Sequence, residues 1–281
     1  MTISTLSTSR AHGGTLSVHE HASASTGTGM TFSVFLPPQA VSGARLPVLL
    51  YLSGLTCTHA NVTDKGEYRR ACAEHGIVFV APDTSPRGDG VADDPQGAYD
   101  FGLGAGFYVN ATQEPFARHY RMWDYIADEL PALLERHFPV DLARMGITGH
   151  SMGGHGALTL GLTYPERFKS LSAFAPIVAP GQVPWGHKAL AGYLGDDRAA
   201  WRAHDAVALI EDGKRPAGAV LVDQGKADGF LAEQLRPELF ASACAAAGVD
   251  LTLRMQPGYD HSYTFISTFM EDHIRWHAQR L

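Results

Sequence analysis

A serine flanked by glycines is the feature of this sequence with the clearest chemical meaning. The residues from Gly149 to Gly153 read GHSMG, the G-x-S-x-G pattern of a nucleophilic serine on a sharp turn between a strand and a helix. Glycine at both ends allows the turn and lets the helix approach the sheet closely. Ser151 could then attack an acyl carbon if a base removes its proton. A chance Gly/Ser turn would give the same letters, so the rest of the chain has to decide.

A candidate acid and a candidate base follow further along the chain, each directly after a predicted strand. Asp223 and Asp228 come after the apolar run 219–222, and His261 comes after the run 251–255. Serine, then acid, then histidine is the chain order of the triad in α/β-hydrolases. We therefore expect an aspartate from the first of these segments to act as the acid, and His261 to act as the base.

Two histidines beside the serine and two backbone N–H groups belong to the same expected site. His150 and His155 lie on the turn itself, so we expect them to point away from the position that a base must occupy. An oxyanion hole needs two donors, and the N–H of Met152 is the first of them. The second should come from the loop after the apolar run 47–52, where we favour the N–H of Leu55.

Hydrophobic patterning predicts the elements that position these residues. Segments 15–20 and 30–36 alternate between apolar and polar residues, which predicts antiparallel strands around a turn at 27–29. The apolar runs 47–52 and 77–81 are typical of central strands covered on both faces. Further strands are predicted at 144–148, 171–175, 219–222 and 251–255, and helices at 65–75, 119–138, 154–163 and 237–247. This alternation predicts an α/β fold with a mostly parallel central sheet and helices on both faces.

Some segments do not follow a regular pattern. Residues 83–115 show no periodicity and residues 176–204 contain several prolines, glycines and aromatics, so we expect both as loop or cap segments around the site. Pro131 implies a kink or a break in the helix predicted around it. On the terminal helix, His273 and His277 have no acid arranged beside them as in a zinc site, so we expect both to be solvated surface residues.

Composition and charge narrow the function classes. The 281 residues are 45% hydrophobic and 18% charged, and we expect one globular domain over residues 1–281. The net charge of −7, without a run of like charge, argues against nucleic acid or an anionic membrane as partner and favours a small-molecule substrate. No signal-peptide core or membrane-spanning stretch is visible, and three cysteines are too few for a disulfide framework or a zinc site. We therefore expect a soluble protein of the reducing cytoplasm.

Several longer runs are similar to those of one known family. They include SGLTCT (53–58), APDTSPRG (81–88), DFGLGAGFYVNAT (100–112), GHSMGGHGAL (149–158), DQGKADGFL (223–231) and GYDHSYTFI (258–266). With these runs the chain, from about residue 47 to its end, resembles the S-formylglutathione hydrolases, also called esterase D, within the α/β-hydrolases. The resemblance implies Ser151, Asp228 and His261 as the catalytic triad. The family often has two adjacent acids where this chain has Ala227 and Asp228, which leaves Asp228 as the matching acid.

The resemblance also implies an activity. It is that of a cytosolic serine thioesterase that cleaves S-formylglutathione to glutathione and formate, the second step of glutathione-dependent formaldehyde detoxification. It implies no metal and no organic cofactor, a preference for short acyl groups, activity on short-chain carboxylic esters, and a homodimer. A general carboxylesterase with the same triad and a noncatalytic binding protein of the same fold are the alternatives, and the intact serine, acid and base favour an enzyme.

Further side chains are candidates for contact with the substrate. Trp185, Phe107 and Tyr108 are bulky residues in the irregular segments, where they could crowd the acyl group. Cys57 lies two residues from Leu55 and could be a second nucleophile, a reactive regulatory thiol or a packing residue, of which we favour the regulatory thiol. Three basic residues are candidates to bind the carboxylates of glutathione: Arg87, Lys188 and Lys226.

Overall fold

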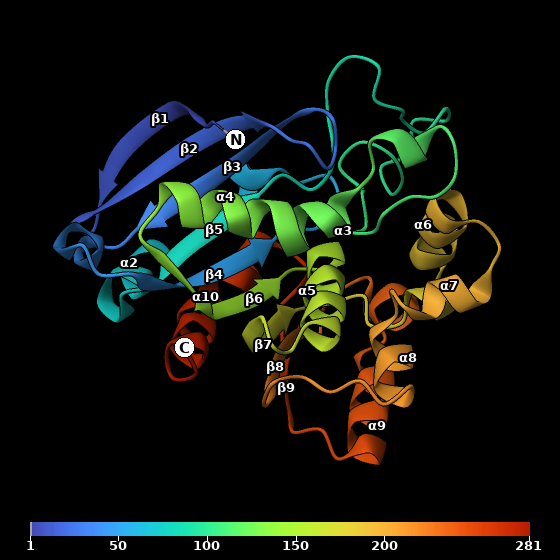
Figure 1. The fold of residues 1–281 in the computed structure, drawn as a ribbon. Coiled ribbons are helices and arrows are strands. Elements are labelled where there is room, and N and C mark those ends of the chain that lie inside the picture. Colours follow the sequence, from blue (N-terminus) through green and yellow to red (C-terminus); the bar gives the residue numbers. More distant parts are fainter. Residues whose placement is uncertain (1) are drawn as a thin grey trace.

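One nine-stranded sheet runs through residues 2–281, the part of the chain that the computed structural model describes (Figure 1). The strand order is β1-β2-β3-β5-β4-β6-β7-β8-β9. The strands are β1 (Ser4–Ala11), β2 (Gly14–Ala22), β3 (Gly29–Leu36), β4 (Leu46–Leu52), β5 (Val78–Pro82), β6 (Val140–Gly149), β7 (Phe168–Phe174), β8 (Val220–Gly225) and β9 (Leu251–Gln256). The sheet is antiparallel from β1 to the β3–β5 pair and parallel from β5 to β9.

The antiparallel end of the sheet contains two strands that the sequence pattern predicted and one that it did not. β2 and β3 pair from Thr15 with Leu36 to Ala22 with Gly29, which confirms the two alternating strands. β1 was not predicted, and it is β1 that forms the edge of the sheet. Its sequence STLSTSRA is exposed on both faces, so it has no apolar periodicity, and backbone pairing with β2 holds it in place.

The parallel strands are buried and bring the candidate residues to one edge. The residues from Val48 to Leu52 in β4 and from Val78 to Ala81 in β5 are at most 1% exposed, which fits their continuous apolar runs. The carboxyl ends of parallel strands lie at the same edge of a sheet. Because the serine follows β6 and the candidate acid and base follow β8 and β9, this topology places all three at that edge.

Helices cover both faces of the sheet (Figure 1). One face carries α1 (His59–Lys65), α2 (Arg69–His75) and α10 (Tyr263–Ala278), and the other carries α4 (Leu130–His137), α5 (Met152–Thr163), α8 (Ala206–Glu211) and α9 (Pro237–Ala247). The predicted helix 154–163 is confirmed as a tightly packed one. A Cβ added at Gly161 of α5 would lie 2.8 Å from the Leu171 side chain, so glycine there lets α5 lie directly on β7.

Two helices differ from their predicted bounds. The predicted helix 65–75 is divided between α1 and α2, and α2 ends at the expected Gly76 with a left-handed φ of 69°. The predicted helix 119–138 starts only at Met122 and is formed by α3 (Met122–Asp124), a π-helical stretch (Tyr125–Glu129) and α4.

The π-helical stretch follows from the proline in this helix. Pro131 has no N–H, and its ring crowds the carbonyl four residues earlier, which belongs to Ala127. That carbonyl instead accepts a hydrogen bond of 2.8 Å from Arg167 Nη1. The helix is therefore widened locally before Pro131 rather than broken there.

The two irregular segments pack against each other beyond the carboxyl edge of the sheet. Residues 83–115 contain no helix or strand among their described residues, whereas residues 176–204, where the sequence showed no regular pattern, fold largely into α6 (Pro184–Leu194) and α7 (Arg198–Arg202). Tyr193 joins the two segments, because its hydroxyl accepts from Gly102 N at 2.9 Å and donates to Ala105 O at 2.8 Å. Short helical turns complete the fold at Pro38–Ser42, Phe116–Arg118, Pro180–Gln182 and Leu231–Leu235.

Candidate active site

Ser151 lies on a strained turn between β6 and α5. Its backbone has φ 58° and ψ −118°, a conformation that residues with a Cβ rarely adopt. The flanking glycines are required by close contacts, because a Cβ at Gly149 would lie 2.3 Å from Gly153 O and one at Gly153 would lie 1.9 Å from Leu52 O. The sharp turn that the G-x-S-x-G pattern predicts is therefore present, and it holds the serine at the carboxyl edge of the sheet.

Two backbone segments border the serine. Met152 is the first residue of α5, so its N–H has no partner within the helix and lies at the positive end of the helix dipole. The loop after β4 approaches from the other side, since a Cβ at Gly54 would lie only 3.1 Å from Ser151 Cβ. The next residue of that loop, Leu55, lines the same cavity as the serine.

His261 forms a hydrogen bond with one aspartate. Its Nδ1 lies 2.6 Å from Oδ2 of Asp228, which is itself only 6% exposed. The same carboxylate accepts hydrogen bonds from Phe230 N at 2.8 Å and from Gln224 Nε2 at 3.2 Å. These contacts hold the carboxylate in position and orient the imidazole. The Nε2 atom of His261 is thereby left free to act as a base in the cavity.

Asp223 has a different environment, because it lies within β8 itself and not in the loop that follows the strand. It is fully buried and accepts hydrogen bonds from Arg254 Nε at 2.9 Å, Gln256 Nε2 at 2.8 Å and His273 Nε2 at 3.0 Å. Burial acts to raise the pKa of this carboxyl, but the hydrogen bonds from His273 and Arg254 lower it to about 2. Asp223 therefore links β8 to β9 and to α10 instead of contacting His261.

His273 and His277 correct another expectation, because both are fully buried and not solvated. Their rings meet at the Ser172 hydroxyl, which lies 2.8 Å from His273 Nδ1 and 2.8 Å from His277 Nε2. Burial lowers the pKa of both histidines, so they are uncharged at neutral pH. The polar partners come from β7 and β8, which a reading of the terminal helix alone could not reveal.

A small cavity brings the candidate residues together. Its volume is about 190 Å³. It is lined by Gly54, Leu55, Thr56, Cys57, Tyr99, His150, Ser151, Trp185, Phe230 and His261. Tyr99 and Phe230 were not predicted, although Phe230 lies only two residues after Asp228. The rings of Tyr99 and Trp185 meet edge to face at 6.3 Å, and those of Trp185 and Phe230 lie 4.6 Å apart, so aromatic side chains form one wall.

Two of the three predicted bulky residues do not line this cavity. Phe107 and Tyr108 are fully buried, so the expectation that they crowd the substrate directly is wrong. Tyr108 instead supports the loop after β4, because its hydroxyl donates to Ser53 O at 2.8 Å. The Phe107 carbonyl lies 3.0 Å from Nε2 of His155. The irregular sequence around them predicted a loop or cap segment, but it carried no sign that these two side chains are buried.

The two histidines near Ser151 have different positions, because His150 lies on the turn and His155 lies on α5. His155 is buried away from the cavity, and burial lowers its pKa to about 3. His150 does not point away from the base as expected, because it lines the cavity and its ring centroid lies 4.3 Å from that of His261. The pKa of His150 is lowered well below 6.5, mainly by burial and also by the neighbouring His261.

Cys57 is partly exposed and lines the cavity. Burial raises the pKa of its thiol above the usual 9.0, while the neighbouring Tyr263 hydroxyl and Gly54 backbone act in the opposite direction. The thiol is therefore reachable from the cavity, but it is mostly protonated at neutral pH. All three cysteines of the chain are free thiols.

The basic candidates lie outside the set of residues that line this cavity. Arg87 Nε is 3.0 Å from Asp83 Oδ2, and its Nη2 donates to Cys57 O at 3.2 Å. Lys188 Nζ lies 2.6 Å from Asp100 and 3.2 Å from Asp94. The charges of Arg87 and Lys188 are therefore already balanced by carboxylates. Lys226 is exposed on the loop after β8.

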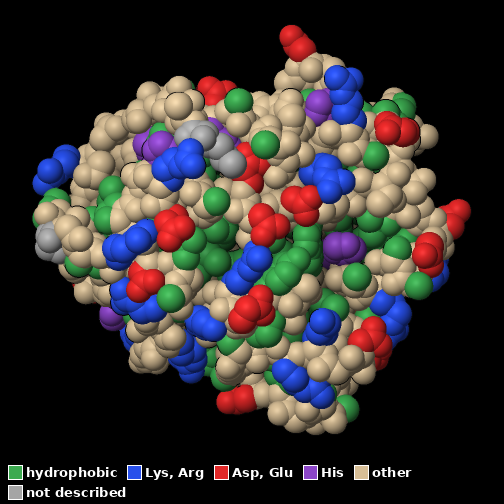
Figure 2. Space-filling model, in the orientation of Figure 1, with side chains coloured by type: hydrophobic (Ala, Val, Ile, Leu, Met, Phe, Trp, Pro, Cys, Tyr) green, Lys and Arg blue, Asp and Glu red, His purple; other side chains and the backbone are tan. Residues whose placement is uncertain are grey.

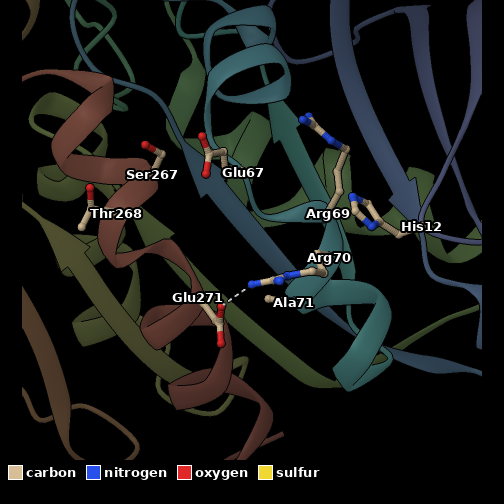
Figure 3. A pocket seen from close by; sticks show the side chains of 8 residues that line it. All are labelled: His12, Glu67, Arg69, Arg70, Ala71, Ser267, Thr268 and Glu271. Atoms are coloured by element: carbon tan, nitrogen blue, oxygen red, sulfur yellow. Dashed lines mark hydrogen bonds and ion pairs between the residues drawn. The ribbon is translucent and has the colours of Figure 1, made fainter.

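A larger cavity of about 490 Å³ lies elsewhere, between α2, α10 and the tip of the β1–β2 hairpin (Figure 3). Its lining contains no paired nucleophile and base, and its charges are balanced, because Arg70 Nη2 lies 3.0 Å from Glu271 Oε2 (Figure 3). Acidic and basic side chains are also interspersed over the visible face of the molecule (Figure 2). Among the described residues no group of His, Cys, Asp and Glu could hold a metal ion, and no helix is long and apolar enough to cross a membrane.

The fold and the site define a class of protein. A mostly parallel sheet with helices on both faces, a serine on a strained strand–helix turn and an Asp–His pair after later strands are the features of an α/β-hydrolase of the serine hydrolase class. A family model described as a putative esterase matches residues 23–276.

The chain belongs to the S-formylglutathione hydrolase family. It is 55% identical to the S-formylglutathione hydrolase of Paracoccus denitrificans over 277 residues, which are 99% of this chain and 98% of that protein. It is 49% identical to the S-formylglutathione hydrolase of Mus musculus, over 100% of this chain and 99% of that protein. A solved structure of an S-formylglutathione hydrolase from Agrobacterium tumefaciens matches with a TM-score of 0.96 and 56% identity, covering 99% of each chain.

Proposed function

We propose that this protein is a serine thioesterase that hydrolyses S-formylglutathione to glutathione and formate, with Ser151 as nucleophile, His261 as base and Asp228 as the orienting acid. Family membership supports the substrate. One observation supports the mechanism most directly: Ser151 and His261 line the same cavity, and His261 is hydrogen-bonded to Asp228. Activity on short-chain carboxylic esters is part of the proposal, because the matching family model is that of an esterase.

The first half of the reaction forms a covalent intermediate. His261 removes the Ser151 proton, and the serine oxygen adds to the thioester carbonyl. The N–H groups of Met152 and Leu55 donate hydrogen bonds to the resulting oxyanion. The intermediate then collapses as its C–S bond breaks, and the glutathione sulfur, whose thiol has a pKa of about 8.5 and which therefore leaves readily, takes the proton from His261. Asp228 holds Nδ1–H of His261 and stabilises the imidazolium.

The second half of the reaction regenerates the enzyme. A formyl group is attached to Ser151 after glutathione has left, and His261 is again neutral. It removes a proton from a water molecule, which attacks the formyl carbon through a second tetrahedral intermediate at the same two N–H donors. Release of formate returns the proton to Ser151. Every proton transfer in this cycle uses side chains of this chain.

The size of the cavity supports a small acyl group. Sites for drug-sized ligands have volumes of about 300–1,000 Å³, whereas this cavity measures about 190 Å³. Trp185 and Phe230 form its aromatic wall next to His261. A formyl or acetyl group fits such a space better than a long acyl chain does.

The further parts of the proposal concern the molecule as a whole. We place it in a reducing cytoplasm, which agrees with its three free thiols. We also propose a single folded domain, in which residues 83–115 and 176–204 surround the site, and a homodimer. Sedimentation velocity on the purified protein measures the oligomeric state directly.

One comparison of substrates tests the proposed activity. The purified protein is assayed for kcat/KM on S-formylglutathione and on p-nitrophenyl acetate at the same pH. We expect a higher value for the thioester, because the site would be selected for glutathione as leaving group. A higher value for the ester would instead favour a general carboxylesterase, and absence of both activities together with absence of labelling by a fluorophosphonate would favour a noncatalytic protein.

A further inference from the structure

The base of the proposed triad is held by one hydrogen bond and two rings. The hydrogen bond from His261 Nδ1 to Asp228 fixes one atom of the imidazole, but a single hydrogen bond leaves the ring plane free to tilt. Phe230 flanks the imidazole nearly edge to face, with centroids 5.1 Å apart and an interplanar angle of 76°. His150 flanks it at 4.3 Å and 46°. These two rings therefore limit how His261 can turn.

The two flanking side chains are held with different firmness. Phe230 lies in the loop after β8 and is 37% exposed. His150 is 5% exposed and is part of the turn that carries the serine. Its backbone N–H donates to Leu52 O at 3.0 Å, and the residue also pairs with Phe174 of β7 in a parallel bridge. His150 is thus the rigid side of the space that holds the base.

His150 also contacts the other parts of the site. A Cβ added at Gly54, in the loop that carries Leu55, would lie 3.2 Å from its Nδ1. Its ring centroid is 6.3 Å from that of Tyr263, the first residue of α10. The serine turn, the segment of the base and the oxyanion loop therefore meet at one side chain. We propose that His150 is a positioning residue that sets the orientation of His261 toward Ser151.

The charge state of His150 suits this role. Burial and the neighbouring His261 lower the pKa of His150 well below its usual range, although the His261 backbone acts weakly in the opposite direction. The ring is therefore neutral at the pH of turnover. A neutral ring can remain packed against His261 when that side chain becomes an imidazolium, whereas a second cation would repel it.

Two acetate esters with different leaving groups distinguish a misoriented base from a loss of folded protein. An alkoxide needs a proton from His261 in order to leave, whereas p-nitrophenolate leaves without one. A misoriented His261 should therefore lower kcat/KM for ethyl acetate more than kcat/KM for p-nitrophenyl acetate. A smaller folded fraction of the protein lowers the measured rates of hydrolysis of both esters by the same factor. This readout rests on the proposed function only in taking Ser151 as nucleophile and His261 as base.

The experiment measures kcat and KM for both esters in the wild type and three variants. We expect His150→Ala to lower kcat with little change in KM, and to lower the ethyl-to-p-nitrophenyl ratio of kcat/KM about tenfold. His150→Phe, which keeps an aromatic ring against His261, should retain the wild-type ratio. The matched control is His155→Ala, which removes another buried histidine, one that lies on α5 with its ring beside Phe107, and it should leave the ratio unchanged.

Three results would overturn the inference. They are an unchanged ratio in His150→Ala, an equal fall of the ratio in His155→Ala, and a ratio in His150→Phe as low as in His150→Ala. If His150→Ala does not fold, His150→Asn also lacks the ring and takes its place. A wild type that hydrolyses neither ester would contradict the proposed function, and with it this inference.

Discussion

Three aspartates are close to the candidate base in the sequence or the fold, and their hydrogen bonds distinguish them. Asp228 accepts from His261, whereas Asp223 accepts from Arg254 and its neighbours, and Asp260 accepts from the backbone N–H and the hydroxyl two residues later at the start of α10. We expect Asp228→Asn to lower kcat about 10⁴-fold, because the amide cannot hold the required tautomer. Asp260→Asn and, per folded molecule, Asp223→Asn should have far smaller effects. Steady-state kinetics of the three variants decide this, and a loss of kcat confined to Asp223→Asn would refute the assignment.

Spacing alone could predict the order of the site residues but not the choice among them. Asp223 and Asp228 both satisfied the Ser–Asp–His order, and the family resemblance selected Asp228. The positions of His150, His273 and His277 were predicted wrongly for a common reason: each is buried by side chains from other strands and helices, and sequence neighbours carry no sign of those contacts.

Cys57 gives a prediction about thiol reagents. We expect N-ethylmaleimide to inhibit the wild type, because Cys57 lines the cavity and an adduct would occupy the space of the substrate. Inhibition should be slow at neutral pH and faster as pH rises, since burial raises the pKa of the thiol. Cys57→Ser should remain active and resist the reagent. Inactivity of a normally folded Cys57→Ser variant would indicate a chemical role for the thiol, and a wild type resistant at every pH would leave only a packing role.

At the scale of elements, Asp223 connects β8, the strand before Asp228, to α10, the helix after His261. Its pKa is lowered to about 2 in the folded protein, so its contribution to stability is present above the unfolded value near 3.8 and is lost as pH falls through about 2. Lowering the pKa of Asp223 from 3.8 to about 2 corresponds to about 2 kcal/mol of stability. Asp223→Asn should therefore lower the free energy of unfolding most above pH 4, and the difference from wild type should shrink toward pH 2. Urea unfolding at several pH values measures it, and a difference independent of pH would contradict this account.

The elements that could be predicted from the sequence are those with an apolar pattern. The buried strands and α5 follow from continuous apolar runs and from small residues, and the turn at Gly27 follows from glycine chemistry. β1 could not be predicted, because both of its faces are exposed. The helix around Pro131 was recognised as irregular, but the release of one carbonyl to Arg167 is a tertiary contact that the local sequence does not contain.

At the scale of the molecule, the packed irregular segments determine how much room the substrate has. Among p-nitrophenyl esters from acetate to octanoate, we expect kcat/KM to be highest for acetate and to fall as the acyl chain lengthens, because the cavity holds only about 190 Å³. Trp185→Ala should extend activity toward longer chains, since Trp185 is part of the aromatic wall. Lys226→Ala, on the exposed loop after β8, is a matched control that should keep the wild-type profile. A maximum at octanoate in the wild type would favour a lipase-like site.

The central claim is that Ser151 performs the hydrolysis of S-formylglutathione, and one assay tests it most directly. Release of glutathione and formate from S-formylglutathione is followed with the wild type and with Ser151→Ala, both checked for folding by circular dichroism. We predict equimolar release of the two products by the wild type and a loss of about 10⁶-fold in the variant, because the triad acts as a unit. A wild type that hydrolyses p-nitrophenyl acetate but not S-formylglutathione, or a folded variant that retains a few per cent of the activity, would contradict the claim.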